Sequence, residues 1–96
     1  MFAMRDELSA DYREAFRQTL ELAGTDLDFR GTRYRAVRSV LDDGNIRYRF
    51  LHEFAVNQGE RFTEVATETR YEVLDFQSVP IAGGFFAFEV TAFPVS

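Results

Sequence analysis

The sequence contains no cysteine, no tryptophan and no lysine, and it has a single histidine. Without cysteine there are neither disulfide bonds nor thiolate metal ligands. Without lysine there is no phosphate-loop lysine and no anchor for a Schiff base or for pyridoxal phosphate, which excludes Walker-type phosphoryl transfer and covalent catalysis by lysine. No apolar run approaches the roughly 20 residues that a membrane-spanning helix needs. We therefore expect a soluble, cytosolic chain without a membrane partner.

The chain has 96 residues, which we take as a single domain over residues 1–96, since domains usually have roughly 100–200 residues. All of its positive charge is arginine: 11 arginines stand against 16 acidic residues, for a net charge of −5. This acidic balance argues against a chain that wraps nucleic acid. Eleven phenylalanines and four tyrosines are a large apolar content for so short a chain, and so small a core is marginally stable. We therefore expect some aromatic side chains to face partners in an oligomer.

Apolar residues at steps of three or four predict one amphipathic helix over about residues 3–22, which ends at Gly24. Its packed stripe is expected to consist of Met4, Leu8, Tyr12, Ala15, Thr19 and Leu22, widened by Phe16, Leu20 and Ala23. Asp11 and Glu14 also form a capping box. Two shorter helices with a break near Ser9 are therefore an alternative.

After Gly24 the apolar period changes from 3.6 to 2, which predicts strands. Turn residues separate six segments, at about 25–29, 32–41, 46–56, 61–66, 70–79 and 85–93. Adjacent apolar pairs at Ala36-Val37 and Val73-Leu74 break the alternation and indicate β-bulges, which curl short strands. We therefore predict an α+β fold, in which the N-terminal helix is followed by a six-stranded, mainly antiparallel β-barrel or sandwich over about residues 25–95.

Asp43-Gly44 is the strongest hairpin signal in the chain. A two-residue loop there would place Arg38 directly opposite Arg49, a repulsive pair that the isolated domain has no reason to prefer. The same register predicts an outer strip of arginines, which we take as a candidate subunit or partner interface: Arg33, Arg35, Arg38, Arg47 and Arg49. The alternative is a solvated strip neutralised by nearby acids such as Asp26 and Asp28, which a hairpin at Arg30-Gly31 would set opposite Arg35 and Arg33.

The last predicted strand is apolar on both faces. Phe85, Ala87 and Phe93 alternate with Phe86, Phe88 and Val90. One face is core, and the other is either a second buried face under the helix, which we favour, or an exposed patch. Phe85 and Phe93 are accordingly also candidate interface residues.

Motifs that carry chemistry are incomplete in this chain. His52-Glu53 begins like a zinc-protease motif but has no second histidine, and no Gly-x-Ser-x-Gly surrounds any serine. The segment from Asp26 to Gly31 imitates a calcium loop, yet Val37 stands where a bidentate glutamate belongs. We therefore predict no catalytic residue, no metal site and no cofactor.

Segments along most of the chain resemble the small head–tail joining proteins of tailed phages, the family of head-closure and lambda-type tail attachment proteins. The resemblance to the N-terminal part of these proteins lies in residues 4–11, 21–24, 28–34 and 42–43. The resemblance to their closing strands lies in residues 59–63, 70–75 and 86–90. The chain departs from the family at Thr67-Glu68-Thr69, where an Asp-Gly turn is usual, and its segment 51–60 is short.

The resemblance implies a virion neck protein without chemistry of its own, assembled in the host cytoplasm. It would form a homo-oligomeric ring, six-fold by expectation, between the portal or adaptor protein and the tail-tube or tail-terminator protein, and would help to retain packaged DNA. One alternative is another phage ring component, such as a tail terminator. Another is a small ligand-binding barrel whose pocket is lined by His52, Tyr48 and Arg35.

Acidic residues are concentrated in the second half of the chain. Residues 49–96 carry seven acids and three arginines, net −4, whereas residues 1–48 carry nine acids and eight arginines, net −1. In a joining ring the acidic half would face the channel and let DNA pass without binding it specifically. The candidate lumen-facing acids are Glu60, Glu64, Glu68 and Glu72.

Overall fold

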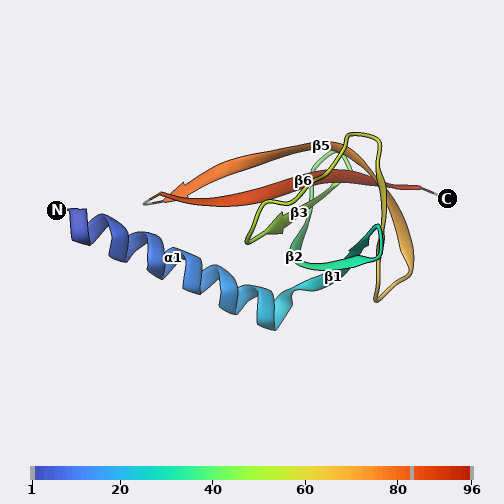
Figure 1. Ribbon diagram of the computed structural model, residues 1–96. Helices are drawn as coiled ribbons and strands as arrows, with labels where there is room; N and C mark the ends of the chain where they lie inside the picture. Colours follow the sequence, from blue (N-terminus) through green and yellow to red (C-terminus); the bar gives the residue numbers. More distant parts are fainter. Residues whose placement is uncertain (1, 83, 96) are drawn as a thin grey trace.

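The computed structural model describes the backbone of residues 2–82 and 84–95 and the side chains of residues 11–81 and 84–95. One helix, α1 (Phe2–Ala23), precedes six strands (Figure 1). The strands are β1 (Thr25–Phe29), β2 (Thr32–Val40), β3 (Ile46–Phe50), β4 (Arg61–Glu64), β5 (Thr69–Ala82) and β6 (Phe85–Val95). The predicted α+β class is confirmed, and α1 is continuous, so the alternative break near Ser9 is wrong.

The strands form a closed antiparallel barrel in the order β1-β2-β3-β6-β5-β4, and β4 pairs back with β1. The barrel, rather than the sandwich, is therefore the architecture. The bulge predicted at Val73-Leu74 is present as a register shift between Val73 and Asp75. The bulge predicted at Ala36-Val37 is wrong, because β2 pairs with β3 without a shift through both residues.

Aromatic rings fill the barrel. Phe29 stacks on Phe62 with 4.4 Å between ring centroids, and Phe62 stacks on Tyr71 at 5.6 Å. The rings of Tyr48 and Phe50 meet this stack edge-on. These side chains come from alternating positions of β1, β3, β4 and β5, so the period of two in the sequence builds one continuous core.

The chain leaves the sheet after Phe50, although alternation predicts a strand to residue 56. Phe54 turns inward from the following loop, and its ring stacks 3.8 Å from that of Tyr34 and lies 5.0 Å from that of Phe29. Val56 is buried as well. The alternating apolar residues of this segment therefore cover the core from a loop rather than from a strand.

The hairpin between β2 and β3 has a three-residue loop, Asp42–Gly44, instead of the predicted two-residue loop. Leu41 N donates to Asn45 O at 2.8 Å, and Gly44 alone in this loop has a positive φ, of 86°. Asp43 Oδ1 accepts a hydrogen bond from Asn45 N at 2.9 Å, which favours the longer loop.

The extra loop residue shifts the register by one position. Arg38 lies opposite Tyr48, and Val37 lies opposite Arg49. The predicted juxtaposition of Arg38 and Arg49 is therefore wrong. The turn with two positive φ values is instead Arg30-Gly31, at 55° and 84°, as a type I′ hairpin requires.

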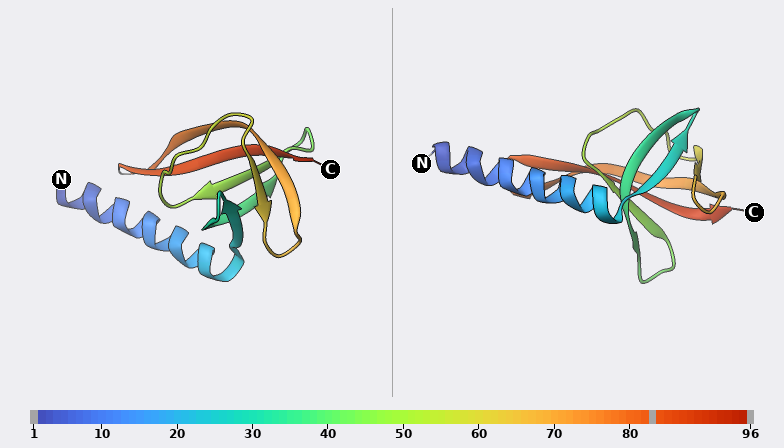
Figure 2. Two further views of the ribbon diagram at one scale, coloured as in Figure 1. Left: turned by 45° about the vertical axis from the view of Figure 1, so that its right-hand side comes forward. Right: turned by 90° about the horizontal axis from the view of Figure 1, so that it is seen from below.

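The β5–β6 ribbon extends beyond the barrel on the same side as α1 (Figures 1 and 2). The helix contacts the ribbon and β2 through Phe16 and Leu20, whereas Leu22 is 89% exposed. Two strands cover only a narrow stripe of a helix, so the predicted packing by Tyr12, Ala15 and Leu22 is wrong: all three are exposed. The predicted contacts of Met4 and Leu8 lie outside the described side chains.

The buried second face of the last strand is confirmed. Phe85 and Ala87 are buried on the face of β6 that α1 covers, and the Phe85 and Phe16 rings lie 6.1 Å apart. The opposite face carries Phe88 into the barrel core, but beyond the barrel it leaves Phe86 exposed.

Phe50→Ala tests the assignment of the core face. Phe50 is 2% exposed, so the substitution should lower the free energy of unfolding by about 3–5 kcal/mol, a large part of the stability of a small domain. Phe86→Ala is the matched control, because Phe86 is 54% exposed, and it should cost about 1 kcal/mol or less. Urea denaturation measures both, and equal midpoints for the two variants would contradict the assignment.

Candidate functional site

The five arginines of the predicted strip do not share one face. Residues alternate along β2 without a bulge, so Arg33 and Arg35 point outward, while Arg38 points to the same side as the buried Tyr48. Arg47 and Arg49 point outward from β3. Four of the five predicted arginines therefore lie on the outer face. Arg38 lies on the inner face, because the predicted bulge at Ala36-Val37, which would have turned it outward, is absent.

Two of the outer arginines hold a buried carboxylate. Glu89 on β6 is 5% exposed and lies directly opposite Arg49. Arg49 Nε donates to Glu89 Oε2 at 2.8 Å, and Arg47 Nε lies 3.7 Å from Glu89 Oε1. This part of the strip is therefore neutralised within the chain, by a glutamate that the alternative of a neutralised strip did not name.

Arg35 fastens α1 to the barrel. Its Nε donates to Leu20 O at 2.6 Å, its Nη2 donates to Glu21 O at 3.4 Å, and its Nη1 pairs with Asp26 at 3.1 Å. The last carbonyl groups of a helix have no partner within the helix, and cations stabilise that end. A Cβ at Gly24 would lie 2.2 Å from Leu20 O and 2.8 Å from Arg35 Nε, so this contact requires glycine.

Arg38 lies at the exposed edge of a polar group that surrounds the buried Glu64 on the inner side of the barrel. Tyr48 donates its hydroxyl hydrogen to Glu64 Oε2 at 2.8 Å, Thr67 donates to Glu64 Oε1 at 3.2 Å, and Arg38 Nε lies 3.6 Å from Glu64 Oε2. Burial raises the pKa of Tyr48, and the Tyr71 hydroxyl and the Glu64 carboxylate raise it further. Glu64 is 6% exposed, so in the isolated chain it points into the barrel and not to a channel.

The other predicted lumen acids are also dispersed. Glu60 pairs with Arg30, and Glu72 lies 3.5 Å from Arg61. Glu68 is exposed in the β4–β5 turn, where its φ is 58°. The structure therefore does not gather the four acids on one face, and three of them already have basic or hydroxyl partners.

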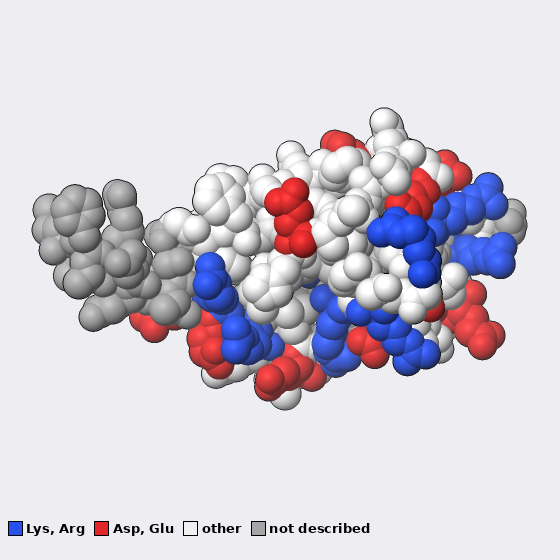
Figure 3. Space-filling model, viewed as in Figure 1, with Lys and Arg blue, Asp and Glu red and all other residues white. Residues whose placement is uncertain are grey.

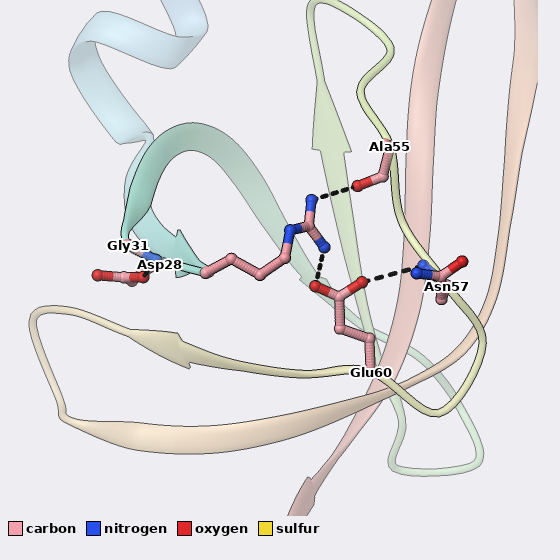
Figure 4. Close-up of polar contacts among 6 residues, drawn as sticks. Asp28, Gly31, Ala55, Asn57 and Glu60 are labelled. Carbon is pink, nitrogen blue, oxygen red and sulfur yellow. Dashed lines mark hydrogen bonds and ion pairs between the residues drawn. The ribbon is translucent and has the colours of Figure 1, made fainter.

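Arg30 closes the loop after β3 onto the β1–β2 turn (Figure 4). It donates to Ala55 O at 2.6 Å and to the Glu60 carboxylate, whose other oxygen accepts from Asn57 N at 3.1 Å. Asp28 Oδ1 accepts from Gly31 N at 2.8 Å and stabilises the same turn. Side chains separated by about thirty positions thus fix this end of the barrel.

A cleft of about 360 Å³ opens beside this turn. Its lining consists of Asp28, Arg30, Gly31, Arg61, Phe62, Thr63 and Arg70. Asp28, Thr63 and Arg70 lie side by side across β1, β4 and β5. Among the described residues, Arg70 has no ion-pair partner. In the view of Figure 3, arginine atoms lie at the barrel end of the molecule and also along the described part of α1.

Sequence reasoning missed this arginine cleft. Its residues are spread over positions 28 to 70, and only the pairing of β4 with both neighbours brings them together. The hairpin signal at Arg30-Gly31 and its cross-strand pairs were predicted correctly, with Asp26 opposite Arg35 and Asp28 opposite Arg33. No residue pattern pointed to the pairing of Asp28 with Thr63.

The pocket of the alternative ligand-binding barrel is not formed by its predicted residues. Tyr48 is fully buried in the core, His52 is exposed in the loop after β3, and Arg35 is occupied on the outer face by α1. Phe93, the remaining candidate interface residue, is half-buried near the end of β6.

Comparisons of the chain with protein-family models, with curated proteins and with solved structures found no match. Within the described residues no three acidic or histidine side chains are grouped as a metal site would need. No described helix combines the length and the apolar character that a membrane crossing requires.

Arg49→Gln tests the pairing with Glu89. Removing one partner of a buried carboxylate leaves part of its hydrogen-bonding capacity unused, so the free energy of unfolding should fall by about 1–3 kcal/mol. Arg33→Gln on the same outer face, where Arg33 is exposed, is the control and should change it by about 0.5 kcal/mol or less. Chemical denaturation measures both variants. An Arg49→Gln protein that is more stable than the natural chain would contradict the pairing and indicate that Arg49 is repelled by its neighbouring arginines.

The raised pKa of Tyr48 predicts alkaline destabilisation. Above about pH 10 the unfolded chain loses this proton while the folded chain keeps it, so the free energy of unfolding should fall with rising pH by up to about 1.4 kcal/mol per unit. Tyr48→Phe should have a shallower slope between pH 10 and 11, roughly the interval just above the ordinary tyrosine pKa. Tyr12→Phe, on the exposed face of α1, should keep the wild-type slope. Equal slopes for all three proteins would refute the prediction.

Proposed function

We propose that the chain is a structural neck protein of a tailed phage or phage-like particle, which forms a ring joining the DNA-filled head to the tail. The observation that carries the proposal is the extension of α1 and the β5–β6 ribbon from a filled barrel. The ribbon face turned away from α1 leaves Phe76 and Phe86 exposed. Exposed aromatic side chains on a projecting ribbon are typical of a surface that neighbouring subunits cover.

The filled interior of the barrel supports a structural role rather than the alternative role of a ligand-binding barrel. The aromatic stack of Phe29, Phe62 and Tyr71 occupies the barrel, and the polar group around Glu64 is satisfied by Tyr48 and Thr67. A barrel of this kind serves as a rigid body that presents its outer surface. The family resemblance of residues 4–11, 28–34 and 70–75 supports the same role.

The neighbours in such a neck would be the portal or adaptor protein on the head side and the tail-tube or tail-terminator protein on the tail side. The proposed ring would be homo-oligomeric, and it would be located in the virion. DNA would pass through it without specific binding. The net charge of −5 favours passage over binding, because phosphate contacts require unpaired cationic groups.

Electron microscopy of the purified protein, alone and mixed with a candidate portal complex, tests the proposal. We expect rings of uniform diameter, either free or seated on the portal. A variant with Phe76→Ser and Phe86→Ser should fold, because both side chains are exposed, but should form fewer rings. A protein that stays monomeric at all concentrations and does not bind the portal complex would overturn the proposal.

Duplex DNA should not bind the isolated protein at physiological salt. Arg30, Arg35, Arg47, Arg49 and Arg61 each pair with a carboxylate of the same chain, so few cations on the described barrel are free to release counterions from DNA. Fluorescence anisotropy with a labelled random duplex measures this. A micromolar, salt-sensitive complex would contradict the proposed passage of DNA.

A further inference from the structure

The arginine cleft and an acidic hairpin tip lie at opposite ends of the same strand. The cleft borders the Arg30-Gly31 turn, which precedes β2, and Asp42 lies in the loop that follows β2. Figure 2 shows the two hairpin ends pointing away from each other. A strand rises about 3.3 Å per residue, so the nine residues of β2 separate the two features by roughly 30 Å.

We propose that the arginine cleft of one copy receives the β2–β3 hairpin tip of a second copy, with Asp42 as the inserted carboxylate. This contact rests on the ring assembly proposed above and names one contact between its subunits. A tip that lies a strand's length from its own cleft can fill only the cleft of another molecule. The resulting contact is head-to-tail, and such contacts repeat into rings when the rotation closes.

The tip offers one free carboxylate. Asp43 is occupied, since its two oxygens accept hydrogen bonds from Asn45 N at 2.9 Å and from Asn45 Nδ2 at 3.0 Å. Asp42 is exposed, and among the described residues it has neither a hydrogen-bond nor an ion-pair partner. The loop therefore holds its shape through Asp43 and presents Asp42 to the solvent.

The cleft offers a matching positive group. Arg30 and Arg61 share their charge with Glu60 and Glu72, whereas Arg70 is exposed and unpaired among the described residues. A guanidinium binds a carboxylate through two parallel hydrogen bonds, which gives the pair direction as well as attraction. Arg70 is therefore the expected partner of Asp42, and the hydroxyl of Thr63 beside it is a further donor.

The charge around the cleft fits a single carboxylate better than a nucleic acid. The cleft arginines, Arg30, Arg61 and Arg70, together with the neighbouring Arg33 give four positive charges, against the three negative charges of Asp28, Glu60 and Glu72. The remaining charge of about one unit is what one aspartate neutralises. A nucleic-acid backbone carries a phosphate at every step, and the three carboxylates would repel it.

Cysteine pairs test the contact directly, because the natural chain has no cysteine. Val40→Cys, at an exposed position beside the tip that leaves Asp42 in place, and Thr63→Cys proteins, mixed under mild oxidation, should form a mixed disulfide dimer at least ten times faster than Gln18→Cys mixed with Thr63→Cys. Gln18 is exposed on α1, away from both features. A chain that carries both Val40→Cys and Thr63→Cys should give a ladder beyond the dimer. Equal rates for the two mixtures, or a ladder that stops at the dimer, would overturn the head-to-tail contact.

A charge exchange supplies an independent test. Asp42→Arg and Arg70→Glu should each lower self-association by at least tenfold in sedimentation, and an equimolar mixture of the two variants should restore long assemblies in which the variants alternate, because each tip then meets a cleft of opposite charge. The chain with both substitutions should restore them, because each contact is then inverted. Failure of this double variant to recover, while both single variants remain folded, would overturn the pairing.

The outcomes separate this contact from the neck function. Rings on the portal complex that neither the cysteine pair nor the charge exchange affects would leave the neck function standing and overturn the contact. A cysteine ladder without portal binding would support the contact while the neck function fails. Binding of duplex DNA that Arg70→Glu abolishes would assign the cleft to nucleic acid and overturn the contact as well.

Discussion

Two carboxylates buried in a chain without lysine impose the pairing of its strands. Glu64 and Glu89 are both nearly inaccessible to solvent, and a buried carboxylate is costly unless it is paired and hydrogen-bonded. Glu89 needs Arg49 directly across β3 and β6. Glu64 needs Tyr48 and Arg38 on the inner face of β2 and β3. A slip of β3 by one residue would move both sets of partners to the wrong face, so these contacts select the observed register.

The arginines can therefore be grouped by the part of the chain to which each one donates hydrogen bonds. Arg35 holds the C-terminal end of α1, Arg49 holds Glu89, and Arg30 holds the loop after β3. In a chain whose only cations are arginines, nearly every strong donor on the barrel already has an internal acceptor. Arg33 and Arg70 have none among the described residues, and of the two only Arg70 lines the cleft. The positive charge that could attract an anionic group is thus concentrated at the end of the barrel where the cleft lies.

The sequence predicted those features that depend on local periodicity. Alternation identified all six strands, and Arg30-Gly31 identified a hairpin whose cross-strand pairs are correct. The prediction of a two-residue loop at Asp43-Gly44 was wrong because Asp-Gly is compatible with loops of two or three residues. The longer loop is selected by the hydrogen bond from Asn45 to Asp43 and by the pairing of Glu89 with its arginine partners. The sequence missed the cleft because the pairing of β1 with β4 joins segments that no local pattern connects.

The two unsatisfied surfaces of the molecule differ in kind. One face of the ribbon presents the apolar side chains Phe76 and Phe86, whereas the barrel end presents the arginine cleft. Apolar contacts are little affected by salt, while an exposed ion pair is screened beyond roughly 8 Å at physiological ionic strength. If the cleft and the ribbon both join copies of the chain, salt should weaken the contact at the cleft and leave the apolar contact of the ribbon in place. The two contacts can therefore be distinguished by how strongly each depends on salt.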